Sequence, residues 1–124
     1  MARSEASLGR DFAEALAVKD FERITSMLDP QLDFRGLTPS RAWEASSASE
    51  AVTDVLGSWF EESDHIDELL NVESATFADR QRVAYQLRGH NEDGPFVVEQ
   101  QAYFTQRDGR IDWMRVLCSG FRPG

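Results

Sequence analysis

The clearest alternation of apolar and polar residues lies in the last third of the chain. It predicts three consecutive strands over residues 83–90, 96–107 and 110–118, joined by short turns at residues 91–95 and at Asp108-Gly109. The Asp-Gly pair is a strong hairpin signal, because a tight turn between strands needs residues that accept a positive φ. These strands predict a long antiparallel sheet, and the rest of the chain must cover at least one of its faces.

The first half of the chain supplies helices that can cover this sheet. Residues 7–18 carry apolar side chains at helical spacing, and Asp20 is placed to cap a second helix over residues 21–28. A third helix is predicted from Ser49, and its apolar positions form a broad stripe: Val52, Val55, Leu56, Trp59 and Phe60. A helix with such a stripe is expected to lie across the sheet.

Two further strands are predicted outside the last third of the chain. Gln31–Arg35 alternates, and Gly36-Leu37-Thr38-Pro39 is expected to end that strand. Residues 40–47, which include Trp43, are expected to be irregular, and His65–Phe77 predicts another strand. The order is therefore helices, one strand, a helix and four antiparallel strands, which indicates an α+β fold in a single domain over residues 1–124.

Composition and charge exclude several classes of function. The chain has 124 residues, 41% of them hydrophobic, and a net charge of −9. That charge disfavours nucleic acid and anionic lipid surfaces as partners. No apolar run approaches the roughly 18 residues that a membrane span needs, and the first residues do not indicate a signal peptide. A single cysteine cannot form an intramolecular disulfide, which fits a cytoplasmic location.

Several segments resemble the nuclear transport factor 2-like superfamily, also described as SnoaL-like or cystatin-like cones. Residues 16–29, Leu-Ala-Val-Lys-Asp-Phe-Glu-Arg-Ile-Thr-Ser-Met-Leu-Asp, resemble its opening, and Phe104–Ile111 resembles its C-terminal hairpin. Thr38-Pro39, Trp43-Glu44-Ala45 and the ending Val116–Pro123 look like a bacterial subgroup. The resemblance implies a cone-shaped α+β fold, in which a curved antiparallel sheet wraps around the helices and leaves an internal pocket open at one end.

The superfamily includes ketosteroid isomerase, scytalone dehydratase, limonene epoxide hydrolase, SnoaL-type polyketide cyclases and non-catalytic dimerising modules. The resemblance therefore implies a fold more firmly than a function. Compared with ketosteroid isomerase, Phe12 stands where that enzyme has its oxyanion-binding tyrosine, and Gly36 stands where it has its catalytic base. Steroid isomerisation by that mechanism is not expected.

The choice of sheet face decides which side chains line the pocket. One face of the 96–107 strand carries Val97, Glu99, Gln101, Tyr103 and Thr105, and the other carries Val98, Gln100, Ala102 and Phe104. Hydrophobicity favours the second face as the buried one, whereas the resemblance favours the first. Following the resemblance, we expect the first face to line the pocket together with Met114, Val116 and Cys118, and the second to pack against a second copy in a homodimer.

Glu99 is the sharpest catalytic candidate on the expected pocket face. A carboxylate in an apolar cone loses solvation and can act as a general acid or base near neutral pH. The alternative is an exposed Glu99 paired with an arginine such as Arg115. Tyr103 could donate a hydrogen bond to a substrate oxygen, or lie at an interface with its hydroxyl in water. Gln101 can orient a carbonyl or hydroxyl.

His65 and His90 are the only histidines. His65 follows acidic residues and could relay a proton to a pocket carboxylate, although a surface histidine beside acids is the commoner case. With two separated histidines and one cysteine, no metal-ligand spacing is present, so neither a metal nor another cofactor is expected. Cys118 has no partnering histidine and is expected to be a small buried hydrophobic residue or a pocket wall.

The remaining candidates are apolar side chains that would hold a ligand. Trp43 is expected to be a lid over an apolar ligand or to pack under a loop. The full set of expected ligand contacts is Gln101, Trp43, Phe34, Phe12, Trp59, Met114, Val116 and Cys118. Three functions follow in order of preference: a cofactor-independent isomerase, cyclase, dehydratase or epoxide hydrolase acting on a small apolar oxygenated molecule; a non-catalytic binder of such a molecule; or a dimerisation module with a closed cavity.

Overall fold

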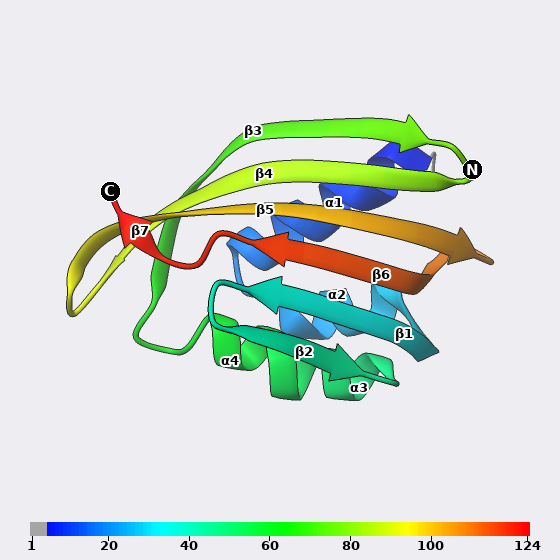
Figure 1. The fold of residues 1–124 in the computed structure, drawn as a ribbon, viewed down its shortest axis with the longest axis horizontal. Helices are drawn as coiled ribbons and strands as arrows, with labels where there is room; N and C mark the ends of the chain where they lie inside the picture. Colours follow the sequence, from blue (N-terminus) through cyan, green and yellow to red (C-terminus); the bar gives the residue numbers. More distant parts are fainter. Residues whose placement is uncertain (1–4) are drawn as a thin grey trace.

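One curved sheet forms the body of the molecule. The structure is a computed structural model that describes residues 5–124, with the side chains of residues 8–124 except that of Phe77. The strands are β1 (Leu28–Thr38), β2 (Arg41–Ala45), β3 (His65–Phe77), β4 (Arg80–Asn91), β5 (Gly94–Arg107), β6 (Arg110–Cys118) and β7 (Arg122–Pro123). Their order across the sheet is β2-β1-β6-β5-β4-β3, and β7 pairs with β5 (Figure 1).

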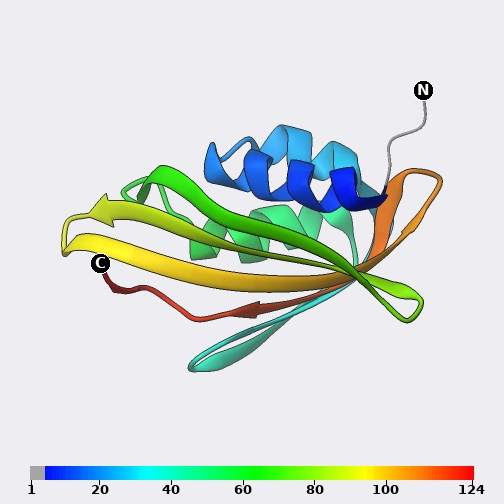
Figure 2. The ribbon, with the colours of Figure 1, turned by 90° about the horizontal axis from the view of Figure 1, so that it is seen from above.

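All the helices of the described residues lie on one side of this sheet, as Figure 2 shows. We call the covered side the inner face and the opposite side the outer face. The arrangement confirms the predicted α+β fold, with one difference in topology: β1 runs parallel to β6, whereas the other neighbouring strands are antiparallel. The expectation about a signal peptide concerns the chain start, where residues 1–4 lie outside the described residues.

The first two helices, α1 (Glu5–Ala17) and α2 (Phe21–Met27), are found where the spacing predicts them. Lys19, at φ 55°, turns the chain between them. The Asp20 side chain accepts a hydrogen bond from the backbone N–H of Arg23 at 3.0 Å, which confirms the predicted cap. The cap satisfies one of the backbone donors that a helix start leaves without a partner.

The third helical segment has a π-helical middle. It consists of α3 (Ala48–Glu50), the π-helical turn η1 (Ala51–Leu56) and α4 (Gly57–Trp59). At its start, Ser47 Oγ accepts from the Glu50 backbone N–H at 3.1 Å, and Glu50 Oε1 accepts from the Ser46 N–H at 2.8 Å. These reciprocal bonds are a form of capping box. The segment buries the predicted stripe, including Trp59 and Phe60.

Two predictions for residues 31–47 are wrong. β1 continues through Gly36 to Thr38, and the passage expected to be irregular contains β2. β2 pairs antiparallel with β1, and Trp43 stands opposite Gly36. A five-residue strand offers too short a pattern to be recognised, and its pairing depends on tertiary contacts such as the edge-on packing of Trp43 against Trp59 at 6.1 Å.

The hairpin between β5 and β6 contains both a confirmed turn and an unpredicted bulge. Asp108 and Gly109 have φ values of 55° and 78°, as the turn signal predicts. Arg107 pairs with Arg110, and without a bulge this register would place Gln101 opposite Val116. Instead, an irregularity between Thr105 and Gln106 shifts the register by one residue, so that Gln101 pairs with Leu117. Thr105 Oγ1 donates to Asp112 Oδ1 at 2.6 Å beside this bulge.

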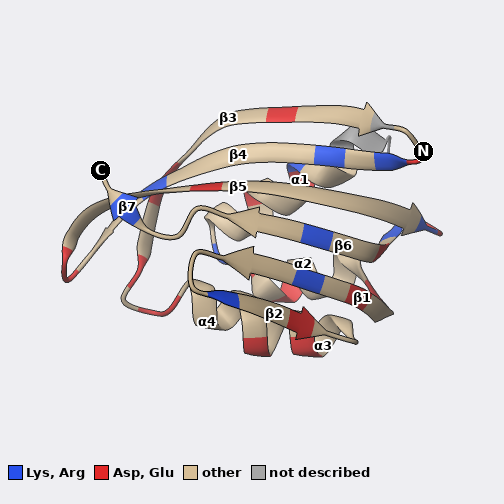
Figure 3. Cartoon of the chain, viewed as in Figure 1, with Lys and Arg blue, Asp and Glu red and all other residues tan. Residues whose placement is uncertain are grey.

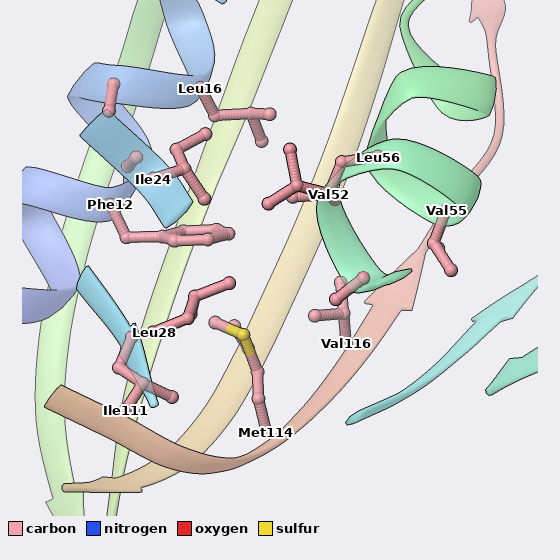
Figure 4. Close-up of a cluster of buried hydrophobic side chains, with 14 of the residues drawn as sticks. Phe12, Leu16, Ile24, Leu28, Val52, Val55, Leu56, Ile111, Met114 and Val116 are labelled. Carbon is pink, nitrogen blue, oxygen red and sulfur yellow. The ribbon is translucent and has the colours of Figure 1, made fainter. Parts of the chain in front are cut away.

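The hydrophobic core fills the space between the inner face and the helices. Figure 4 shows Phe12 of α1, Val52 of η1 and Met114 of β6 pointing toward one another, and Met114 has no exposed surface. Phe34 of β1 is also buried, at 1% exposure. Five of the expected ligand contacts therefore belong to the packed core: Phe12, Phe34, Trp59, Met114 and Val116.

Candidate functional site

The inner face of β5 carries the residues that hydrophobicity alone favours. Phe96, Val98, Gln100, Ala102 and Phe104 are all buried, and none of them is more than 3% exposed. The expectation that Glu99, Gln101 and Tyr103 line the cone is therefore wrong. A one-residue change in register moves every side chain of a strand to the opposite face. The bulge between Thr105 and Gln106 is that change: it leaves Met114, Val116 and Cys118 inside while the β5 residues expected beside them point outward.

A row of polar side chains crosses the inner face on three neighbouring strands. Tyr85 of β4 pairs with Gln100 of β5, which pairs with Cys118 of β6. The Tyr85 hydroxyl donates to Gln100 Oε1 at 2.6 Å, and Gln100 Nε2 donates to Cys118 Sγ at 3.3 Å. Tyr85 and Gln100 are each 2% exposed. We call these three residues the inner polar row.

Burial fixes the protonation state of Tyr85. Desolvation raises the pKa of Tyr85 well above its ordinary value of 10, and the neighbouring Cys118 thiol acts in the same direction. The phenol therefore keeps its proton at any physiological pH and acts as a hydrogen-bond donor. A neutral buried donor of this kind stabilises an oxygen atom that carries partial negative charge.

Trp59 packs on β1, the strand next to β6, and carries an unused donor. It packs against Gly36, where an added Cβ would lie 2.6 Å from Trp59 Cη2, so only glycine fits under the indole. Gly36 pairs with Val116, and Cys118 is the next inward residue of that strand. The Trp59 indole Nε1 is buried and has no hydrogen-bond partner. A buried donor without an acceptor costs free energy, so it marks a place where an acceptor would bind.

Trp43 is part of the wall next to Trp59. Its ring stands edge-on to Trp59, and the Arg41 guanidinium lies 3.8 Å from the ring centroid. Its Nε1 donates to Thr38 Oγ1 at 3.0 Å. Trp43 is half-buried and is held on β2 by these contacts. They support a packing role for Trp43 rather than the role of a lid.

The segment after β6 closes one end of the inner face, and we call residues 119–124 the C-terminal strap. Phe121 lies 4.4 Å from Phe96 and 5.9 Å from Phe60 between ring centroids, and is 39% exposed. Ser119 donates its N–H to Glu99 O at 2.8 Å, and its Oγ accepts from the Glu99 N–H at 2.9 Å. The strap is therefore held by a few backbone bonds and one aromatic side chain.

Glu99 and its expected partners lie on the outer face. Glu99 Oε1 accepts from Gln86 Nε2 at 2.7 Å, and Gln86 Oε1 accepts from Asn71 Nδ2 at 2.8 Å. Arg115 pairs with Asp33 rather than with Glu99, at 3.1 Å. Glu99 and Gln101 are exposed, and Tyr103 is half-buried. Figure 3, which looks onto this face, shows both acidic and basic residues along the strands.

A hollow of about 520 Å³ lies among these outward side chains. Its lining includes two carboxylates, several amides and the half-exposed Leu117: Asn71, Glu73, Gln86, Glu99, Gln101 and Leu117. Both carboxylates belong to exposed residues. Their charge is therefore solvated by water, and they do not lie in an apolar cone. The general acid or base role predicted for Glu99 rested on desolvation, and that condition is not met at its position.

His65 does not approach Glu99. Its ring stacks on His90 at 5.0 Å between centroids, and His90 Nδ1 lies 2.9 Å from Asp67 Oδ2. Among residues 5–124, no group of three His, Cys, Asp or Glu side chains is arranged to hold a metal ion. Nor does any helix in this part of the chain have the length and apolar character needed to cross a membrane.

The sequence reasoning missed Tyr85 and Gln100. One signal was present, because a glutamine on the more hydrophobic face of a strand marks a polar group that needs a buried partner. Of the buried polar or charged side chains in residues 8–124, only Asp64 carries a carboxylate, and it binds the Glu61 N–H and Asn91 Nδ2 at 3.0 Å each. The inner polar row can therefore donate hydrogen bonds to an oxygen, but it lacks a carboxylate base.

Comparison with known proteins identifies the fold. No family model and no curated protein sequence matches the chain. Among solved structures, a LEH-like epoxide hydrolase from M. tuberculosis has a TM-score of 0.68 at 14% identity, covering 92% of this chain and 81% of that one. An NTF2-like protein of unknown function from Cytophaga hutchinsonii has a TM-score of 0.61 at 14% identity, covering 99% and 94%.

A third structure supports the same conclusion. A hypothetical protein with a ketosteroid isomerase-like fold from Catenulispora acidiphila, in complex with trimethylamine, has a TM-score of 0.69 at 11% identity and covers 94% of this chain and 88% of that one. At these identities the likeness establishes the fold and not an activity.

Proposed function

We propose that this chain, which has the nuclear transport factor 2-like fold, binds a small, mostly apolar molecule carrying an oxygen function between its helices and the inner face of its sheet. The observation that carries the proposal is the buried hydrogen bond between Tyr85 and Gln100, 2.6 Å long. It lies among apolar side chains that would pack more favourably against another apolar residue. A polar pair retained at such a place is suited to recognising a polar atom of a ligand.

A ligand oxygen would replace Gln100 Oε1 as the acceptor of the hydrogen bond from the Tyr85 hydroxyl. Because burial keeps the phenol protonated, Tyr85 can donate to a carbonyl, ether or hydroxyl oxygen. The Gln100 amide can then accept from a ligand hydroxyl or keep its contact with Cys118. The unpartnered Trp59 Nε1 offers a second donor near this end of the inner face. Val116 and Phe96 are buried in this structure, and they would supply apolar surface for the rest of the ligand once the strap is displaced.

The C-terminal strap gives the ligand a way in. Phe121 covers Phe60 and Phe96, and both of these rings are otherwise buried core residues. Displacing a 39% exposed aromatic side chain and a two-residue strand disturbs less structure than opening the sheet or lifting α1. We therefore place the entrance at the strap.

Binding without turnover is the function that these groups support. Catalysis of the isomerase, cyclase, dehydratase or epoxide-hydrolase type needs a group that moves a proton beside the substrate. Tyr85 and Cys118 are the titratable side chains on the inward positions of β4, β5 and β6, and desolvation holds Tyr85 in one protonation state. The outer-face Glu99 is on the wrong side of the sheet to serve this site.

The expectation that the face carrying Val98, Gln100, Ala102 and Phe104 packs against a second copy is wrong, because this face is buried within the chain, on the side of the sheet that the helices cover. We propose instead a cytoplasmic homodimer that forms through the outer face.

The proposal is tested with two probes of similar shape. 2-Acetylnaphthalene carries a carbonyl oxygen, and 2-ethylnaphthalene has nearly the same shape without it. We expect both to raise the thermal unfolding midpoint and the ketone to bind roughly tenfold more tightly, the equivalent of about one buried hydrogen bond. Tyr85→Phe should abolish that difference while leaving the hydrocarbon affinity unchanged.

Two results would count against the proposal. Equal affinities for ketone and hydrocarbon in the native chain would show that the inner polar row does not recognise oxygen. No stabilisation by either probe, together with no stabilisation in a Phe121→Ala variant, would indicate a closed module. The Phe121→Ala variant separates a blocked entrance from an absent site.

A further inference from the structure

The only two histidines of the chain lie side by side at one end of the sheet. His65 is the first residue of β3, and His90 lies next to the last residue of β4. The two residues are directly paired across these strands. Their rings are stacked, with centroids 5.0 Å apart and planes inclined by 25°. Their distance along the sequence hides this pairing, which exists only because β3 and β4 form a hairpin.

Asp67 orients the His90 ring. Asp67 Oδ2 lies 2.9 Å from His90 Nδ1. A carboxylate at this position favours the neutral tautomer with its proton on Nδ1, in which Nε2 keeps a free lone pair. A carboxylate bound to the far nitrogen of a histidine is the arrangement that typically supports metal-ligating imidazoles. The His65 ring makes no hydrogen bond to any residue of the described part of the chain, so its nitrogens are also available.

The backbone holds the two histidines in place. Gly89 pairs with Ile66, and a Cβ at Gly89 would lie 2.0 Å from the His65 carbonyl oxygen. Only glycine allows β3 and β4 to approach this closely, so the pair of histidines is fixed by the strand crossing. On the other side, Asp64 anchors the loop before His65 through the Glu61 N–H and Asn91 Nδ2.

We propose that His65 and His90 bind one divalent transition-metal ion of the nickel, copper and zinc group. Imidazole nitrogen is a preferred ligand for these ions, at about 2.1 Å for zinc. Both residues are exposed, so rotation of the His65 ring can bring one nitrogen from each ring to a common ion. Because no third side chain is in position among residues 5–124, water completes the coordination shell.

The surroundings suit a cation. The pair lines a hollow of about 500 Å³ whose other charged side chains are Glu62, Asp64, Asp67 and Lys19. Three carboxylates against one ammonium leave this hollow net negative, and the Lys19 ammonium contacts the Glu61 carbonyl oxygen. The bound ion would tie the start of the edge strand β3 to β4, and it does not touch the inner polar row.

The test is a Cu²⁺ titration of the full chain, purified without a polyhistidine tag and treated with a chelator. Calorimetry should give one Cu²⁺ per chain with a micromolar or lower dissociation constant. The electron paramagnetic resonance spectrum should show coupling to two nitrogen ligands. Asp67→Asn should lower the affinity by about 10- to 100-fold, and His65→Asn and His90→Asn should each lower it further. The exposed Asp54→Asn variant removes the same charge elsewhere and should leave the affinity unchanged.

The inference fails if the double variant His65→Asn/His90→Asn keeps the Cu²⁺ affinity of the native chain. It also fails if the native chain binds only at millimolar concentrations, or if the spectrum reports a single nitrogen ligand. Because both side chains are exposed, these variants should keep the native circular dichroism spectrum. A loss of binding therefore reports the ligands and not the fold.

Discussion

The hydrogen bond between Tyr85 and Gln100 makes a quantitative prediction about stability. Tyr85→Phe removes one oxygen atom, keeps the ring and leaves Gln100 Oε1 without its donor in a site where both residues are 2% exposed. A buried acceptor that loses its partner costs about 1–3 kcal/mol. For a chain of this length, that corresponds to a lower unfolding midpoint by roughly 3–5 °C for each kcal/mol.

A double-mutant cycle separates this bond from packing effects. Gln100→Met leaves the Tyr85 hydroxyl without an acceptor and should cost about the same as Tyr85→Phe. Tyr85→Phe/Gln100→Met replaces both partners with apolar groups, so its loss should be smaller than the sum of the single losses by about 1 kcal/mol or more. Urea unfolding at pH 7 measures all three free energies.

Tyr103→Phe is the matched control, because Tyr103 is the other tyrosine and is half-buried on the outer face. Its loss should stay below about 1 kcal/mol. The reasoning is refuted if Tyr85→Phe costs no more than Tyr103→Phe, or if the two single losses add within about 0.5 kcal/mol in the double variant. Either result would mean that the inner polar row is not a coupled buried pair.

Three further predictions follow from the same structure. Gly36→Ala should destabilise the chain by about 1–3 kcal/mol because its Cβ would meet Trp59, and Trp59→Leu in the same chain should recover part of that loss in urea unfolding. Because the pKa of Tyr85 is raised, above pH 10 the unfolded state loses a proton that the folded state keeps. The contribution of this residue to the free energy of unfolding should therefore fall by about 1.4 kcal/mol per pH unit above pH 10. In urea unfolding at alkaline pH, Tyr85→Phe should show a smaller fall of this free energy with pH than the native chain. Native mass spectrometry should give twice 14.0 kDa, and Leu117→Glu on the outer face should give the monomer; a native chain that is monomeric at every concentration would contradict the proposed dimer.

Much of the fold was predictable from local signals. Asp20 before an apolar helical stripe and Asp108-Gly109 between two alternating segments each specify one local geometry, and both are found as predicted. The short β2 strand was not predictable, because its five residues are ordered by pairing with β1 and by the contact between Trp43 and Trp59. Propensity carries little information where tertiary contacts decide.

The site was harder to predict because it depends on one extra residue. The bulge beside Asp112 changes the register of the β5–β6 hairpin and so decides whether Gln100 or Gln101 points toward the helices. A bulge has no reliable sequence signature, although the hydrophobic pattern of β5 did favour the correct face. The pairing of His65 with His90 was hidden for a similar reason, since it follows from the register of β3 on β4.

The central claim is that a small oxygenated ligand binds on the inner face of the sheet. Intermolecular nuclear Overhauser effects between 2-acetylnaphthalene and the methyl groups of the chain test it directly, because neighbouring residues point to opposite faces. We predict contacts to Val98 and Val116, which are buried on the inner face, and none to Val97 and Leu117 on the outer face. Contacts to Val97 and Leu117 instead would place the ligand in the outer hollow beside Glu99 and contradict the account.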